Sequence, residues 1–150
     1  MALLNLLDNN LILLKIESAS KNELISKLLT RIYDAGLAPP FPFDEVLGKI
    51  YMREEIGGNL LPSGLSVPHA RLGNYEGFIL AMGTAIEPIF YDGIQIRLMS
   101  LMISSQSGGP YYLPTLAELT KLSRDGEYFS RLCSAETPDD LIEIIRERDS

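Results

Sequence analysis

Residues 94–103 read IQIRLMSLMI, and this stretch decides the fold class that the sequence predicts. Most of its residues are apolar, and the turn-forming residues Gly108-Gly109-Pro110 end the section. An apolar run of this length bounded by turns is typical of a strand that is buried on both faces. We therefore expect a sheet strand here with other elements packed against both of its sides.

Other strands are predicted before this stretch. Residues 11–17 indicate a strand or an extended entry, and short strands are expected at 65–67 and 78–85. Residues 56–64 contain three glycines and a proline, which favours a loop between the first helices and these strands.

Two helices are predicted ahead of the short strands. Ser20 and Glu23 match a capping box, in which a hydroxyl caps a helix and a carboxylate follows three residues later. Apolar residues then recur at helical spacing, so the first helix is expected over about 21–35. Asp44 is the expected cap of a second helix that fades near Glu55.

Three more helices are predicted after the strands. A leucine stripe marks one helix over 113–122, and a shorter one is expected at 128–133. Thr137 and Pro138 are typical of a helix start, with a cap followed by a proline in the first turn. Helices thus precede and follow a strand-rich middle, which predicts an α/β fold with helices on both faces of a mixed sheet, in one domain spanning 1–150.

The composition of the 150-residue chain limits the function classes. A net charge of −7 disfavours nucleic acid as a partner, because the phosphate backbone is also negative. One histidine and the single cysteine, Cys133, are too few for a disulfide or a structural zinc site, and we expect no metal and no cofactor. No apolar stretch is long enough to span a bilayer and no secretory signal is visible, so a cytoplasmic protein is expected.

The single histidine is the strongest candidate for chemistry. His69 follows Val67 and Pro68, and because proline favours an extended residue before it, we expect His69 in an exposed loop just past a strand end. A neutral imidazole there offers a lone pair as a nucleophile near neutral pH. Arg53 and Arg71 are candidate phosphate partners, since guanidinium groups match phosphate oxygens.

The same residues also have simpler interpretations. A lone histidine in a loop is more often an ordinary surface residue. Arg53 and Arg71 could be solvated surface charges, and Asn59 is as well suited to stabilising a turn as to contacting phosphate. Tyr111 and Tyr112 could simply cover the end of the helix that follows them.

A family resemblance favours the chemical interpretation. Residues 53–57, Arg-Glu-Glu-Ile-Gly, and residues 64–71, Gly-Leu-Ser-Val-Pro-His-Ala-Arg, resemble the signature of type-2 enzyme IIA domains of the sugar phosphotransferase system. The resemblance extends over roughly residues 4–147. It implies the mannitol-type enzyme IIA fold, a mixed sheet of about five strands flanked by helices. It also implies that His69 is the phosphoacceptor and that Arg53 has a conformational or phosphate-contacting role.

The chain departs from this family at three positions. Asn59 stands where the family usually has threonine, Pro62 where it has glycine, and Tyr112 where it has a second active-site histidine. A tyrosine hydroxyl can donate a hydrogen bond to a phosphohistidine, but with a pKa near ~10 it cannot carry an imidazole's proton at neutral pH. We expect Arg53, Asn59, Arg71 and Tyr112 to support His69 in the site.

The first function that the resemblance implies is protein-histidine phosphoryl transfer. His69 would take phosphate from the histidine phosphocarrier protein and pass it to a cysteine of an enzyme IIB domain, or hold it as a regulatory mark. Both partners would dock over an exposed apolar collar, for which we expect Leu60, Leu61, Leu65 and Tyr112. This function requires a solvent-open imidazole with cationic or N–H donors nearby.

Two alternatives predict something different. The missing second histidine favours a nitrogen-type enzyme IIA-like regulatory module that works by protein contact, with reduced or lost transfer. A structural domain without histidine chemistry is the third interpretation, and it predicts that His69 is buried or turned away from any cleft.

Overall fold

Strand β7 (Leu98–Ser105) is the longest strand and lies inside the five-stranded sheet. On one side it pairs antiparallel with β4 (Ile79–Ala85), which in turn pairs parallel with the edge strand β1 (Ile12–Ile16). On its other side it pairs parallel with two short strands in succession, β2 (Leu65–Ser66) and β3 (His69–Leu72). The predicted mixed sheet of five strands is therefore confirmed.

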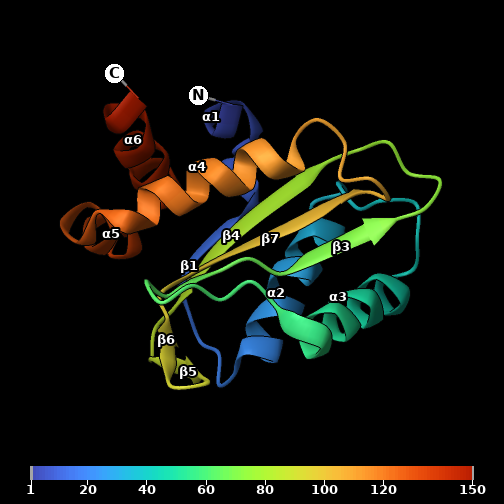
Figure 1. Cartoon of the computed structure of the whole chain (residues 1–150), viewed down its shortest axis with the longest axis horizontal. Helices are drawn as coiled ribbons and strands as arrows, with labels where there is room; N and C mark the ends of the chain where they lie inside the picture. Colours follow the sequence, from blue (N-terminus) through green and yellow to red (C-terminus); the bar gives the residue numbers. More distant parts are fainter. Residues whose placement is uncertain (1, 150) are drawn as a thin grey trace.

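Helices cover both faces of this sheet in the computed structural model, which describes residues 2–149 and the side chains of residues 3–148 (Figure 1). One face carries α2 (Lys21–Asp34) and α3 (Phe43–Gly57). The helices that cover the other face are α1 (Ala2–Leu6), α4 (Tyr112–Arg124), α5 (Gly126–Cys133) and α6 (Pro138–Asp149), with the 3-10 helix η1 (Asn9–Leu11) between α1 and β1. The predicted α/β layering is confirmed.

The core has two halves because the side chains of β7 alternate across the sheet. Leu98 and Met102 lie in the half that includes α4, α5 and α6. Met99, Leu101 and Ile103 lie in the half formed with α2 and α3. All five are at most 1% exposed, so the expected strand with two buried faces is confirmed for residues 98–105.

The prediction of one continuous strand over 94–103 is wrong at its start. Residues Ile94–Ile96 form β6, which pairs antiparallel with β5 (Ile89–Tyr91) in a separate two-stranded ribbon. Arg97 breaks the run: its backbone N–H donates to Gly64 O at 2.8 Å, and its guanidinium donates to Ser130 Oγ at 2.7 Å. Periodicity cannot show these long-range partners, so the break was not predicted.

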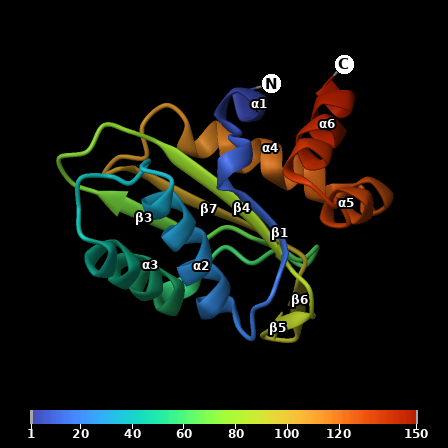
Figure 2. The same cartoon turned by 180° about the vertical axis from the view of Figure 1, so that it is seen from behind.

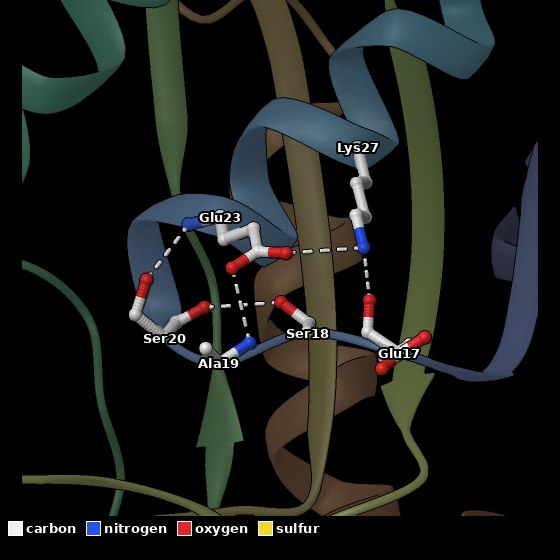
Figure 3. A network of polar contacts seen from close by, with 6 residues as sticks. All are labelled: Glu17, Ser18, Ala19, Ser20, Glu23 and Lys27. Carbon is white, nitrogen blue, oxygen red and sulfur yellow. Dashed lines mark hydrogen bonds and ion pairs between the residues drawn. The ribbon is translucent and has the colours of Figure 1, made fainter.

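Helix α2 begins where the sequence predicts it. Ser20 is the N-cap, and its hydroxyl accepts from Glu23 N at 3.1 Å, while the Glu23 carboxylate accepts from Ala19 N at 3.1 Å (Figure 3). Lys27 bridges Glu23 at 3.1 Å and also donates to Glu17 O. These contacts satisfy free N–H groups of the first turn and join it to the end of β1.

Helix α3 begins differently from the prediction. Pro42 is its N-cap residue and makes no side-chain cap hydrogen bond, and Asp44 lies inside the first turn, where its charge favours the positive helix end. At the start of α6, by contrast, Thr137 Oγ1 accepts from Asp140 N at 3.1 Å, as predicted.

The view from behind shows α2 and α3 side by side on one face of the sheet, where α2 packs against β4 and α3 against β3 (Figure 2). Helices α1 and α6 contact each other on the opposite face, so both ends of the described chain lie on that side. Within residues 2–149, every helix is too short or too polar to cross a membrane.

Candidate functional site

His69 is the first residue of β3, and this position differs from the predicted loop. Its pairing partner on β7 is Met102, and Arg71 pairs with Ser104. Since alternate residues of a strand share a face, the side chains of His69 and Arg71 lie on the same side of the sheet. Met102 N donates to Pro68 O at 3.0 Å, so the chain is already paired with β7 where His69 begins the strand. The sequence analysis expected no strand over residues 69–72.

The expectation of a solvent-open imidazole is wrong for this structure. The His69 side chain belongs to a residue that is only 3% exposed, which is the burial that the structural-domain interpretation predicted. Its cover is the ring of Tyr112, which stacks on the imidazole with the centroids 4.0 Å apart and the planes 10° apart. The residues next to His69 in the sequence do not indicate this stack, because Tyr112 is far away along the chain.

Tyr112 lies where the resemblance placed it, next to His69. It is the first residue of α4 and is 6% exposed. Its hydroxyl accepts a long hydrogen bond from Asn59 Nδ2 at 3.4 Å, and the guanidinium carbon of Arg71 lies 5.3 Å from its ring centroid. The structure therefore brings together four of the predicted site residues: His69, Asn59, Arg71 and Tyr112.

Ser104 is a site residue that the sequence reasoning missed. Its Oγ lies 2.7 Å from His69 Nε2, and it also donates to Ser105 O at 3.0 Å. Ser105 O accepts a second hydrogen bond, from Gly108 N at 3.0 Å, in the turn that leads to Tyr112. The only sequence signal was a serine pair at the end of an apolar strand, and the strand register was needed to place it beside the histidine.

The surroundings of His69 keep its ring neutral. Burial is the largest cause of a pKa lowered to about 4, and the positive charges of Arg71 and Arg53 lower the pKa further. At neutral pH the imidazole therefore carries one proton and one lone pair. Arg53 lies exposed on α3 and acts on His69 through its charge.

A buried ion pair joins the start of α2 to α3, a few residues before the loop that carries Asn59. Lys21 Nζ lies 3.3 Å from Glu54 Oε1, both residues are at most 8% exposed, and the Tyr91 ring covers the lysine with its centroid 3.6 Å from Nζ. The Glu54 carboxylate also packs on Gly58, where an added Cβ would lie 2.4 Å from Glu54 Oε2. A side chain at position 58 would therefore require the Glu54 carboxylate to move from its place beside Lys21.

The expected apolar collar is only partly confirmed. Leu65 is wrong as a collar residue, because it lies on β2 beside β7 and is fully buried in the half of the core that includes α4. Leu60 and Leu61 are half-buried. The exposed apolar residues beside Tyr112 are instead its neighbours, Tyr111 at 47% and Leu113 at 70%.

The chain is similar to known proteins both in sequence and in structure. Residues 5–148 match the family model described as "Phosphoenolpyruvate-dependent sugar phosphotransferase system, EIIA 2". The 2-O-alpha-mannosyl-D-glycerate-specific EIIABC component of Escherichia coli is 28% identical over 99% of this chain. The chain spans only 23% of that relative's length.

Two solved structures share the fold. The nitrogen regulatory protein IIA-Ntr from Neisseria meningitidis superposes with a TM-score of 0.83 at 18% identity, covering 97% of this chain and 99% of that one. Enzyme IIA mannitol from Escherichia coli, solved in complex with phosphorylated enzyme IIB, has a TM-score of 0.74 at 18% identity, covering 95% and 98%. Because the family match covers nearly the whole chain, the protein belongs to the EIIA 2 family of the phosphoenolpyruvate-dependent sugar phosphotransferase system.

Proposed function

We propose that this chain acts as a cytoplasmic phosphocarrier domain, with residues 1–150 as one unit, and that His69 is the residue phosphorylated. The donor would be the phosphohistidine of the histidine phosphocarrier protein. The acceptor would be a cysteine of an enzyme IIB domain, unless the phosphoryl group is held as a regulatory mark. Enzyme IIB is the partner of enzyme IIA mannitol in the solved complex that shares this fold.

The observation that carries the proposal is a neutral imidazole beside two positive charges, at the position of the family motif. Burial and the charges of Arg71 and Arg53 lower the pKa of His69 to about 4, so the ring keeps a lone pair at neutral pH. Phosphoryl transfer passes through a loose transition state and needs mainly positioning and charge stabilisation. Arg71, on the same face of β3, is suited to stabilising the phosphoryl oxygens.

The proposed transfer requires the Tyr112 ring to move away from the imidazole. Tyr112, at the start of α4, is the residue whose ring covers the imidazole. The turn before it contains Gly108 and Gly109, with φ values of +89° and +61°. Glycine adopts such left-handed conformations without steric cost and also allows others. A docked partner that contacts Tyr111 and Leu113 would be well placed to displace Tyr112.

The closed stack also favours a second candidate function. A regulatory module that works by protein contact has no need of an open histidine, and Tyr112 replaces the family's second imidazole with a group that cannot carry its proton near neutral pH. In this case the surface around Tyr112 would bind a target protein, with little or no phosphoryl transfer.

One assay separates the two candidates. The protein is incubated with enzyme I, the histidine phosphocarrier protein and phosphoenolpyruvate, and bound phosphate is measured on the wild type and on His69→Ala. Stoichiometric, acid-labile phosphate on the wild type alone supports the phosphocarrier. No uptake, together with a stable complex between the unphosphorylated chain and a partner protein, supports the regulatory module.

A further inference from the structure

A cavity of about 260 Å³ lies where three parts of the chain meet. It is lined by the start of α2, by the end of α3 with the loop that follows, and by the β5–β6 ribbon. Figures 1 and 2 both show this ribbon at the end of the molecule where α2 begins, and α2 contacts β5. His69 and the residues predicted to support it are not part of the lining, so the cavity is separate from that site.

The inner wall of the cavity already holds one ammonium group. Lys21 and Glu54 are 7% and 8% exposed, and Lys21 Nζ lies 3.3 Å from Glu54 Oε1 and 3.6 Å from the centroid of the Tyr91 ring. A carboxylate together with an aromatic face is an arrangement by which proteins recognise ammonium and guanidinium groups. The chemistry that binds an organic cation is therefore present in the wall.

Two further carboxylates of the lining are not used by Lys21. Glu55 on α3 and Asp92 in the turn of the ribbon are exposed, and neither forms an ion pair within the described part of the chain. With Glu54 they bring three negative charges to the lining, and Lys21, its one cation, offsets one of them. Two negative charges remain, which attract a cation and repel an anion.

The size and the apolar part of the cavity suit a small organic ligand. Leu60 and Ile94 are half-buried, and Tyr91 is 41% exposed, so all three offer apolar surface to an alkyl chain. The volume falls below the ~300–1,000 Å³ of sites for drug-sized ligands, which favours a smaller one. Among the described residues no group of three metal-ligating side chains converges, so this lining is better suited to an organic cation than to a metal ion.

We propose that this cavity binds an organic cation that carries an ammonium or guanidinium head on a short alkyl chain. The head lies at the carboxylates of Glu55 and Asp92, and the chain lies along Leu60 and Ile94, while Lys21 keeps its place on the inner wall. A free alkylamine or alkylguanidine has this chemistry, and so does a lysine or arginine side chain of another protein. The inference does not depend on phosphoryl transfer.

The first test uses n-butylguanidine as the probe and n-butylurea as its neutral analogue of similar shape. Addition of the probe to the ¹⁵N-labelled full chain should shift the backbone amide signals of Gly57, Gly58 and Asp92 in NMR spectra, and these shifts should saturate. The urea should leave the same signals unchanged. Absence of shifts, shifts confined to other parts of the chain, or equal shifts with both compounds would overturn the proposal.

Variants assign the binding to the exposed carboxylates. Glu55→Gln and Asp92→Asn should each weaken binding of the probe by up to about 5-fold, the range measured for exposed ion pairs. Asparagine tolerates the left-handed backbone of position 92, where φ is +51°, so the fold should survive. Glu45→Gln is the matched control, because it removes an exposed carboxylate near the other end of α3, outside the cavity. Wild-type affinity in both cavity variants would contradict the proposal.

A peptide distinguishes the two sources of the cation. A capped Gly-Arg-Gly tripeptide presents the same guanidinium group on a polypeptide chain. Tighter binding of the peptide than of butylguanidine would identify an arginine side chain of a protein as the occupant. Equal or weaker binding would identify a free organic cation, and binding of neither compound would overturn the proposal.

Discussion

The ring of Tyr112 lies nearly parallel to the imidazole of His69, with the ring centroids 4.0 Å apart and an angle of 10° between the planes. This stack joins the first residue of α4 to the first residue of β3. It places the only histidine of the chain beneath a side chain that has to move before any reagent can reach the ring face.

Removal of the Tyr112 ring should make His69 more reactive. We expect Tyr112→Ala to raise the rate of modification by diethyl pyrocarbonate about 2- to 12-fold, since an aromatic pair contributes about 0.5–1.5 kcal/mol. Tyr112→Phe keeps the stack and loses only the long bond from Asn59, so it should react at nearly the wild-type rate. Absorbance at the wavelength of carbethoxyhistidine measures the reaction, and equal rates for all three proteins would show that Tyr112 does not shield the ring.

Replacement of Tyr112 by histidine tests its role in transfer. If the tyrosine occupies the place of a second active-site imidazole, Tyr112→His should accelerate phosphoryl transfer to His69, because an imidazole can exchange a proton near neutral pH and a phenol cannot. Single-turnover labelling with the phosphorylated carrier gives the rate. An unchanged rate would mean that the identity of residue 112 does not affect the transfer.

The lowered pKa of His69 predicts a pH-dependent stability. The ring binds a proton at pH 6.5 in the unfolded chain but only near pH 4 in the folded one, so the unfolded state binds more protons between these values. The free energy of unfolding is therefore highest, as far as His69 is concerned, above about pH 6.5. It falls by on the order of 3 kcal/mol as the pH is lowered to about 4, because the folded state does not take up the proton that the unfolded state binds.

Urea unfolding of the wild type and of His69→Gln at a series of pH values measures this contribution. The difference in unfolding free energy between the two proteins should change in favour of the variant as the pH falls from 6.5 to 4, because glutamine does not titrate. A difference that stays constant over this range would contradict the lowered pKa.

The buried pair of Lys21 and Glu54 should be sensitive to the loss of one partner. Glu54→Gln leaves the lysine, at 7% exposure, without its countercharge, and we expect a loss of about 3–5 kcal/mol in unfolding free energy. Lys21→Met combined with Glu54→Gln should recover part of that loss, because no uncompensated charge remains. Urea denaturation of both single variants and the double variant measures the coupling, and additive effects would show that the pair does not interact.

Local signals predicted most of the fold. The Ser20 capping box, the helical periodicity after it and the apolar run of residues 98–103 each specify an element through residues that are close in sequence, and all three are confirmed. The family motif placed His69 and Tyr112 in one site, although they are far apart in the chain.

The features that the sequence did not predict all depend on long-range contacts. The break in the strand at Arg97 depends on hydrogen bonds to Gly64 and Ser130. The burial of His69 depends on the position of the first residue of α4, Tyr112, over the first residue of β3. The hydrogen bond between His69 and Ser104 depends on the register of β3 against β7. Sequence periodicity carries no information about these registers, which explains why the exposed histidine was expected and the serine was missed.

The most direct test of the central claim is the amount of phosphate on His69. The wild type, His69→Ala and His69→Gln are incubated with enzyme I, the histidine phosphocarrier protein and phosphoenolpyruvate, and the acid-labile phosphate bound to each is quantified by mass spectrometry. The account predicts about one phosphoryl group per wild-type chain and none on either variant, with both variants folded. Stoichiometric phosphate on a folded variant without His69, or none on the wild type while the carrier is phosphorylated, would contradict it.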